Sequence, residues 1–125
     1  MTMFKPQDLK FTKEHEWIST DGTVGISDHA QKELGDVVFV ELPKLSAVLK
    51  KGQEMGVLES VKSVSSMYSP VDGTVSKVNE KLSQAPELVN HEPYGQGWIA
   101  RLSISDVKQL DGLMNYSDYM TFIGK

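Results

Sequence analysis

The stretch that organises the chain runs from Gly56 to Gly73 and reads GVLESVKSVSSMYSPVDG. Residues that favour strands occupy both halves of it, and glycine and proline bound it. The segment from Ser60 to Ser63 separates the two halves and predicts the turn of a β-hairpin. Lys62 then stands at the hairpin tip, although no Asn-Gly or Asp-Gly pair marks the turn.

Lys62 has an ordinary interpretation and a functional one. As one of 13 Lys and Arg residues, it would simply solvate a loop. A lysine that forms Schiff bases needs an apolar pocket, and the neighbouring sequence supplies too few apolar residues for one. A lysine at a hairpin tip is instead accessible to a modifying enzyme, and two paired strands fix where it points.

Length and composition predict one globular domain over residues 1–125, with a core at about 11–104 and a helical tail at 105–123. Hydrophobic residues make up 39% of the chain and charged residues 24%. The net charge of −4 and the lack of a basic run argue against binding to nucleic acid or to an anionic membrane. The chain has no cysteine, so any sulfur chemistry must come from an attached group.

No apolar run approaches the roughly 20 residues that cross a bilayer, and the first residues lack the features of a signal or transit peptide. We therefore expect a cytoplasmic protein of bacterial type, or a mitochondrial-matrix protein if the chain is a processed eukaryotic form. A monomer is the default expectation.

Short strands dominate the expected secondary structure. They cover residues 11–18, 23–26, 36–42, 53–58, 63–68, 73–78 and 98–104. The strand at 36–42 is nearly all apolar, which predicts burial of both faces, and the strand at 98–104 should turn Trp98 inward. Trp17 and Trp98 are both expected in the core or in the wall of a groove.

Helices are expected only at the edges of this β structure. Ser27 and Asp28 offer N-cap oxygens for a helix from Asp28 to Leu34 that ends at Gly35. A single helical turn is expected within residues 83–89, and the tail at 105–123 should form two helices separated by the breakers Gly112 and Asn115. The fold class is mainly β: a flattened β barrel or sandwich with short peripheral helices and a C-terminal helical tail.

Six segments, in order, resemble the glycine cleavage system H-protein family. Glu59 to Lys62 (ESVK), followed by SPVDG at 69–73, resembles the lipoyl-attachment segment of that family. The others are KEHEW at 13–17, VGISDHAQ at 24–31, LGDVVFVELP at 34–43, PELVN at 86–90 and PYGQGW at 93–98. The resemblance covers about residues 11–122 and implies a lipoyl/biotinyl-type fold.

The resemblance implies that lipoic acid is attached covalently to Lys62, with Glu59, Ser60 and Val61 completing the attachment motif. It implies a non-catalytic carrier that takes an aminomethyl group from the pyridoxal-phosphate-dependent glycine decarboxylase (P protein) to the tetrahydrofolate-dependent aminomethyltransferase (T protein). Dihydrolipoyl dehydrogenase (L protein) then reoxidises the arm. A lipoate ligase or a lipoyl/octanoyl transferase attaches the group.

An aminomethyl adduct would hydrolyse in open water, so the carrier is expected to shelter the loaded arm in a groove. The resemblance implies that the segment His15 to Trp17 contributes to it, and we expect Glu16 to be the carboxylate that holds the amine. The alternative interpretation of Glu16 is a solvated charge on an edge strand. Many relatives carry aspartate where this chain has Ser66, which weakens the hold on the arm unless the serine accepts a hydrogen bond. That departure would also suit an H-like relay that passes lipoyl groups to other lipoyl-dependent enzymes.

Other functions have weaker support in the sequence. The three histidines lack the spacing of a metal site, so none is predicted. No Gly-x-Ser-x-Gly motif indicates a serine hydrolase, and Gly95 and Gly97 lack the context of a dinucleotide-binding loop. Biotinyl domains usually flank their lysine with methionines, whereas Val61 and Ser63 flank Lys62. Lipoyl domains of multienzyme complexes are typically followed by a linker and a second domain, whereas this chain ends with helices.

Overall fold

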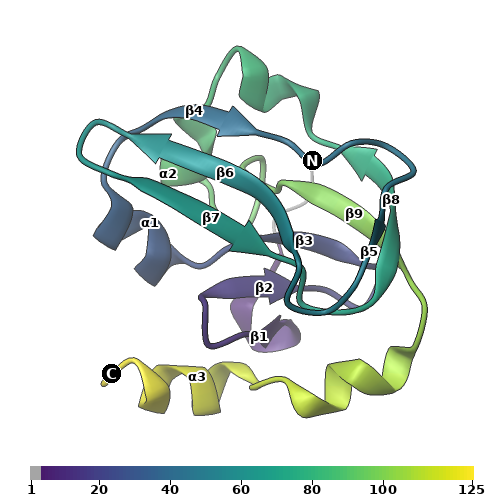
Figure 1. Ribbon diagram of the computed structural model, residues 1–125. Coiled ribbons are helices and arrows are strands. Elements are labelled where there is room, and N and C mark those ends of the chain that lie inside the picture. Colours follow the sequence, from purple (N-terminus) through teal and green to yellow (C-terminus); the bar gives the residue numbers. More distant parts are fainter. Residues whose placement is uncertain (1–3) are drawn as a thin grey trace.

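The computed structural model describes residues 4–125, so the first three residues of the expected 1–125 domain lie outside it (Figure 1). The elements in chain order are η1 (Pro6–Asp8), β1 (Lys10–Phe11), β2 (Glu16–Ile18), β3 (Thr23–Ile26), α1 (Asp28–Leu34), β4 (Val37–Glu41), β5 (Val48–Leu49), β6 (Glu54–Ser60), β7 (Val64–Tyr68), β8 (Gly73–Val78), η2 (Glu80–Ser83), α2 (Leu88–His91), β9 (Ala100–Ile104), η3 (Val107–Gly112) and α3 (Tyr116–Phe122). None of these helices has the length and apolarity needed to cross a membrane.

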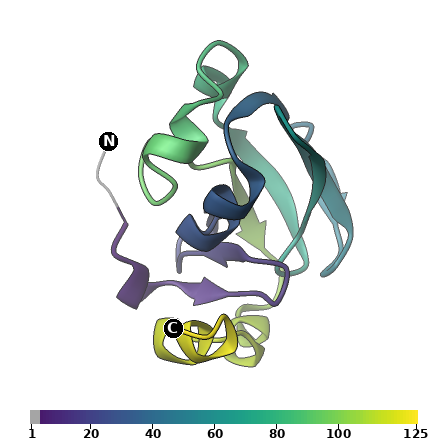
Figure 2. The ribbon, with the colours of Figure 1, turned by 90° about the vertical axis from the view of Figure 1, so that its left-hand side faces the viewer.

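The strands form two antiparallel sheets, as the mainly β fold class predicts. One sheet has six strands in the order β1-β2-β3-β9-β8-β5, and the other has three in the order β4-β6-β7. The two sheets form the layers of a flattened sandwich and neither closes into a barrel (Figures 1 and 2). The predicted hairpin is β6 and β7, which lie in the smaller sheet.

A continuous apolar core holds the two sheets together. Both sheets contribute fully buried side chains to it, among them Val40, Leu58 and Met67 from the smaller sheet and Val24, Val75 and Leu102 from the larger. Met55 and Leu58 of β6 and Met67 of β7 point into this core, which helps to fix the register of the hairpin.

The C-terminal tail packs against β1 and adds a second, aromatic cluster. Phe11 and Met114 exchange two backbone hydrogen bonds of 2.8 and 3.0 Å. The rings of Phe11 and Tyr119 stack with centroids 4.4 Å apart, and both residues are fully buried. As predicted, the tail is two short helices, with the break between Gly112 and the N-cap Asn115.

Helix α1 has the predicted bounds. The Ser27 side chain accepts a hydrogen bond from the Ala30 amide as the N-cap, and Gly35 ends the helix with φ of 85°. The Gly35 amide donates to the Gln31 carbonyl. These local signals also place the C-terminus of α1 directly before β4.

The prediction that the strand at 36–42 buries both faces is wrong. Val37 and Val40 are buried, but Val38 and Phe39 are 54% and 51% exposed. The smaller sheet has a single layer of core behind it, so its other face meets solvent. An irregularity between Val37 and Phe39 adds one residue to β4 relative to β6.

Three further expectations need correction. Residues 11–18 form two strands, because the chain turns before His15, whose φ is 74°. The strand expected at 98–104 begins only at Ala100, and Trp98 before it is half-buried against the aromatic cluster, whereas Trp17 is fully buried and confirms the core prediction. The helical turn expected within residues 83–89 is replaced by η2 and α2 on either side of Pro86.

Candidate functional site

Lys62 lies in the turn that joins β6 to β7, as the sequence predicts. One serine side chain closes this turn. The Ser60 hydroxyl oxygen accepts hydrogen bonds from the amides of Ser63 and Lys62, at 3.0 and 3.3 Å, and the hydroxyl donates to the Ser63 carbonyl at 3.2 Å. The Ser60 amide also donates to that carbonyl, at 2.8 Å. Ser60 therefore has a structural role in this turn.

The same interactions explain how the hairpin forms without Asn-Gly or Asp-Gly. The common tight hairpin turns need positive φ, which those pairs supply. Among the non-glycine residues from 4 to 125, only His15 and Ser46 have positive φ. Val61 and Lys62 thus keep ordinary φ values, and the Ser60 hydroxyl supplies the acceptor that a backbone turn would otherwise need.

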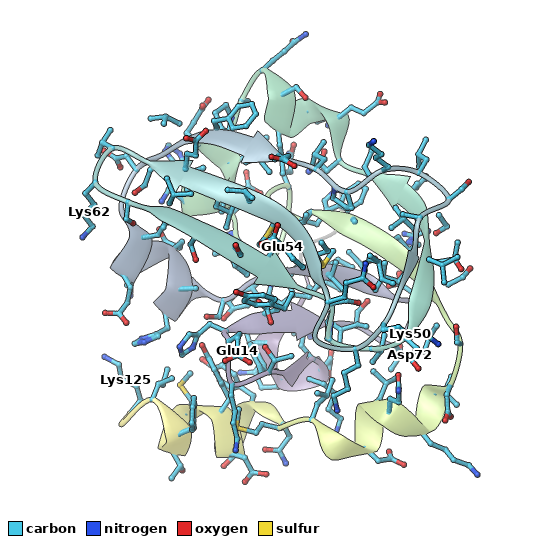
Figure 3. The ribbon with its side chains drawn as sticks, viewed as in Figure 1. Glu14, Lys50, Glu54, Lys62, Asp72 and Lys125 are labelled. Atoms are coloured by element: carbon cyan, nitrogen blue, oxygen red, sulfur yellow. The ribbon has the colours of Figure 1, made fainter. Side chains whose placement is uncertain are left out.

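The Lys62 side chain is exposed at the free end of the hairpin (Figure 3). Its aliphatic part lies over Gly35, where an added Cβ would come within 3.2 Å of the Lys62 Cε. The Val61 amide donates to the Asp36 carbonyl at 3.1 Å, which ties the turn to the start of β4. Within the described chain, no carboxylate forms an ion pair with Lys62.

A groove of about 300 Å³ begins beside Lys62 and runs between β7 and α1. Its walls are apolar near the core and polar at the rim. The lining residues are Glu14, His15, Glu16, Ile26, Ala30, Glu33, Leu34, Leu58, Ser63, Val64, Ser65, Ser66 and Met67. Ser63 lies at the lysine end, whereas Glu14 and His15 come from the turn before β2 and Glu16 is the first residue of β2.

Glu16 is 4% exposed, so its interpretation as a solvated charge on an edge strand is wrong. Strand β2 lies between β1 and β3. The Glu16 carboxylate accepts hydrogen bonds from the Thr12 hydroxyl at 2.5 Å and from the Tyr68 amide at 3.1 Å. Burial raises the pKa of Glu16, and these two hydrogen bonds oppose the rise.

A second cavity of about 260 Å³ lies on the other side of Glu16, and Glu14 and Glu16 line both cavities. Its remaining walls come from the turns around Lys13, Gly52 and Pro70 and from the tail near Met114. Glu16 therefore forms part of the boundary between the two cavities.

The Ser66 hydroxyl donates a hydrogen bond of 2.7 Å to the Glu54 carboxylate, and Ser66 also lines the groove. Because its proton is directed at Glu54, the lone pairs of the oxygen remain able to accept a hydrogen bond. Ser66 can therefore accept a hydrogen bond from a group in the groove while it donates its own proton to Glu54.

Sequence analysis missed Tyr119. Its hydroxyl lies 2.8 Å from Nδ1 of His15 and 2.6 Å from Oγ of Ser27. His15 belongs to the groove end that carries Glu16, while Ser27 caps α1, the opposite wall. The sequence predicts that the tail is helical, but nothing local in it indicates these partners of Tyr119.

His15 and His29 lie close to each other, and neither belongs to a metal-binding cluster among the described residues. Burial lowers the pKa of His15, and the neighbouring His29 lowers it further. The His15 and His29 rings are 5.0 Å apart, and His29 pairs with Glu33 at 3.3 Å. Over residues 4–125, no group of three or more His, Asp or Glu side chains is arranged to hold a metal ion.

The family model described as glycine cleavage H-protein matches residues 9–125. The chain is 51% identical over 121 residues to the glycine cleavage system H protein of Myxococcus xanthus, covering 94% of each protein. It is 51% identical over 123 residues to that of Coprothermobacter proteolyticus, covering 95% of this chain and 97% of the relative. The crystal structure of a glycine cleavage system H protein from Mycobacterium marinum superposes with a TM-score of 0.87 at 34% identity, over 97% of this chain and 100% of that one.

The buried Glu16 should make the stability of the protein fall as the pH rises. Its folded-state pKa lies above its ordinary value of 4.5, so the folded state keeps a proton that the unfolded chain has released. The stabilising contribution of Glu16 to the free energy of unfolding is complete below that ordinary value. It is lost as the pH rises through the folded-state pKa. Urea unfolding of wild type and Glu16→Gln, from about pH 4 to pH 7, measures the effect as the pH dependence of the difference between them.

Asp21→Asn provides a control of opposite sign. Burial works to raise the pKa of Asp21, but hydrogen bonds from Ser19 and Thr23 outweigh it and hold the pKa below the ordinary value. The contribution of Asp21 is therefore present above its ordinary pKa of 3.8 and lost as the pH falls through the lower folded-state pKa, so the unfolding series for this control extends down to about pH 2.5. A contribution of Glu16 to stability that stays constant or grows as the pH rises would contradict a raised pKa for this residue.

Proposed function

The chain belongs to the glycine cleavage H-protein family, and from this membership we propose that Lys62 is the residue to which its lipoyl group is attached. The family makes the chain a lipoyl carrier in glycine cleavage. The observation that carries the assignment to Lys62 is its exposed position on a serine-closed turn beside a groove. We further propose that the whole chain, 1–125, is one carrier domain and catalyses no step itself.

The surroundings of Lys62 fit a group of this kind. The amine is exposed and, among the described residues, is not held by a carboxylate, so an acylating enzyme can reach it. In acylation, Nζ as the free amine attacks the carbonyl carbon of an activated acyl group. The new amide C–N bond forms, the bond to the leaving group breaks, and the nitrogen gives up a proton. The lipoyl group supplies a disulfide that opens and recloses by exchange, which this cysteine-free chain otherwise lacks.

The groove has nearly the length that such an arm requires. The four steps along β7 from Ser63 to Met67, which both line the groove, cover about 13 Å. A lysine side chain extended by a lipoyl chain contains about a dozen single bonds and spans roughly 15 Å. An arm laid along the groove would therefore end near the Tyr68 amide, which is hydrogen-bonded to Glu16.

We assign Glu16 the task of accepting the ammonium of the aminomethyl cargo. Its carboxylate is buried at the far end of the groove, where a charge-assisted hydrogen bond is stronger than in water. Glu14 and the Ser66 hydroxyl, which line the same groove, add acceptors. Apolar side chains such as Leu34 and Met67 keep water from the cargo.

The partners follow from the role. The chain would receive the aminomethyl group from glycine decarboxylase, deliver it to the aminomethyltransferase and be reoxidised by dihydrolipoyl dehydrogenase. A lipoate ligase or a lipoyl/octanoyl transferase would load Lys62. The relatives named above are bacterial, which supports a bacterial setting; a cytoplasmic location is part of the proposal.

Intact mass spectrometry tests the attachment site. Co-expression with a lipoate ligase and lipoate should add the mass of one lipoyl group to the wild type and none to Lys62→Ala. Lys50→Ala removes another exposed lysine in a turn and should be modified like the wild type. Modification of Lys62→Ala at another residue would refute the assignment.

The role of Glu16 can be tested once the protein is lipoylated. Removing the charge should weaken the hold on the ammonium by about tenfold or more, since hydrogen bonds to charged groups contribute about 1.5–3 kcal/mol. Loaded Glu16→Gln should therefore release ammonia at least about tenfold faster than loaded wild type. Glu41→Gln alters an exposed carboxylate on β4 and should match the wild type. Equal release from loaded wild type and Glu16→Gln would show that Glu16 does not protect the cargo.

A further inference from the structure

The smaller sheet exposes large apolar side chains around the lysine turn. Val38, Phe39, Val61 and Val64 are 54%, 51%, 73% and 66% exposed. We call these four residues the tip patch. Neither the core nor the groove explains the exposure of Val38, Phe39 and Val61, because none of them lines the groove. Clustered apolar exposure on a small protein marks a surface that meets another molecule.

The register of the strands places these side chains together. Phe39 on β4 lies opposite Glu59 on β6, which lies opposite Val64 on β7. Residues directly opposite one another share a face of the sheet, so these three side chains form one row on the solvent-facing side. The irregularity in β4 adds Val38 beside Phe39, and the turn adds Val61 at the end.

The charges around the tip patch are almost all negative. The segments 36–41 and 59–64 contain three carboxylates, Asp36, Glu41 and Glu59, and a single cation, Lys62. Asp36 and Glu41 are exposed and Glu59 is half-buried. A partner that covers the tip patch must therefore present an apolar centre with a basic border.

We propose that the tip patch is the docking surface for the enzyme that acylates Lys62, an inference that rests on the proposed attachment site. This enzyme must bring its active site onto the Lys62 amine itself, next to Val61 and within two residues of Val64. The enzymes that act at the sulfur end of the arm meet their target up to roughly 15 Å from the lysine backbone. Only the acylating enzyme is obliged to contact the turn.

The position of the Lys62 side chain indicates from which side the acylating enzyme approaches the turn. Its side chain covers Gly35 at the end of α1, so that side of the turn is occupied by the protein itself. The hairpin projects away from the rest of the fold at this end (Figure 3). An enzyme that reaches Nζ therefore covers Val61 and Val64, and Phe39 extends the contact along the sheet.

The test is the acylation rate of unmodified protein with purified lipoate ligase, ATP and lipoate. Phe39→Ser and Val64→Ser should each lower kcat/KM at least about tenfold, mainly through KM, as loss of an apolar anchor does. Val48→Ser and Val107→Ser remove valines that are equally exposed, at 69% and 66%, but lie on β5 and η3. Both should be acylated at the wild-type rate.

The charge at the border of the tip patch gives a separate test. Glu41→Lys reverses one of these charges and should raise the KM for acylation, and added salt should weaken that effect.

A second measurement separates docking from general damage. Fully lipoylated Phe39→Ser, whose altered residue does not line the groove, should be reoxidised by dihydrolipoyl dehydrogenase within about twofold of the wild type, because that enzyme works at the arm's end. Wild-type acylation kinetics in both variants would overturn the proposal while leaving Lys62 as the attachment site. Normal acylation with slowed reoxidation would also overturn it, by assigning the tip patch to a different partner. Failure of the wild type to be lipoylated would instead refute the proposed function.

Discussion

The position of Lys62 depends on the hydroxyl of Ser60. This hydroxyl accepts hydrogen bonds from the backbone amides of Lys62 and Ser63 and donates one to the Ser63 carbonyl. The turn therefore closes at ordinary backbone angles. The strands on either side are fixed by the core through residues such as Leu58 and Met67. A flexible side chain therefore leaves from a fixed point, which is what a carrier needs to serve several enzymes.

The groove beside the lysine owes its shape to parts of the chain that are far apart in sequence. One wall is the hairpin, another is α1, and the far end is formed by the start of β2 at Glu16 and the turn before it. The buried Tyr119 hydroxyl bonds to both His15 and Ser27 and so connects the tail to two of these walls. The tail thus helps to hold the groove in place as well as covering the aromatic cluster.

Local signals in the sequence predicted local structure well. The N-cap and the terminal glycine gave α1 its bounds, and the serine-rich segment gave the turn its place. Contacts between distant residues could not be predicted in this way. Tyr119 lies 104 residues from His15, and the exposure of Phe39 depends on which face of β4 receives a covering layer. Burial of Glu16 has the same origin, because its partner Tyr68 belongs to the other sheet.

The central claim is that an arm on Lys62 lies along the groove and ends at Glu16. Amide chemical shifts of isotope-labelled protein, compared before and after lipoylation, test it directly. The account predicts shift changes that continue from the turn along β7 to Tyr68, and across to α1 and residues 14–16, with the rest of the fold unchanged. Changes confined to residues 61–63 would mean that the arm stays in solvent, and they would contradict the account.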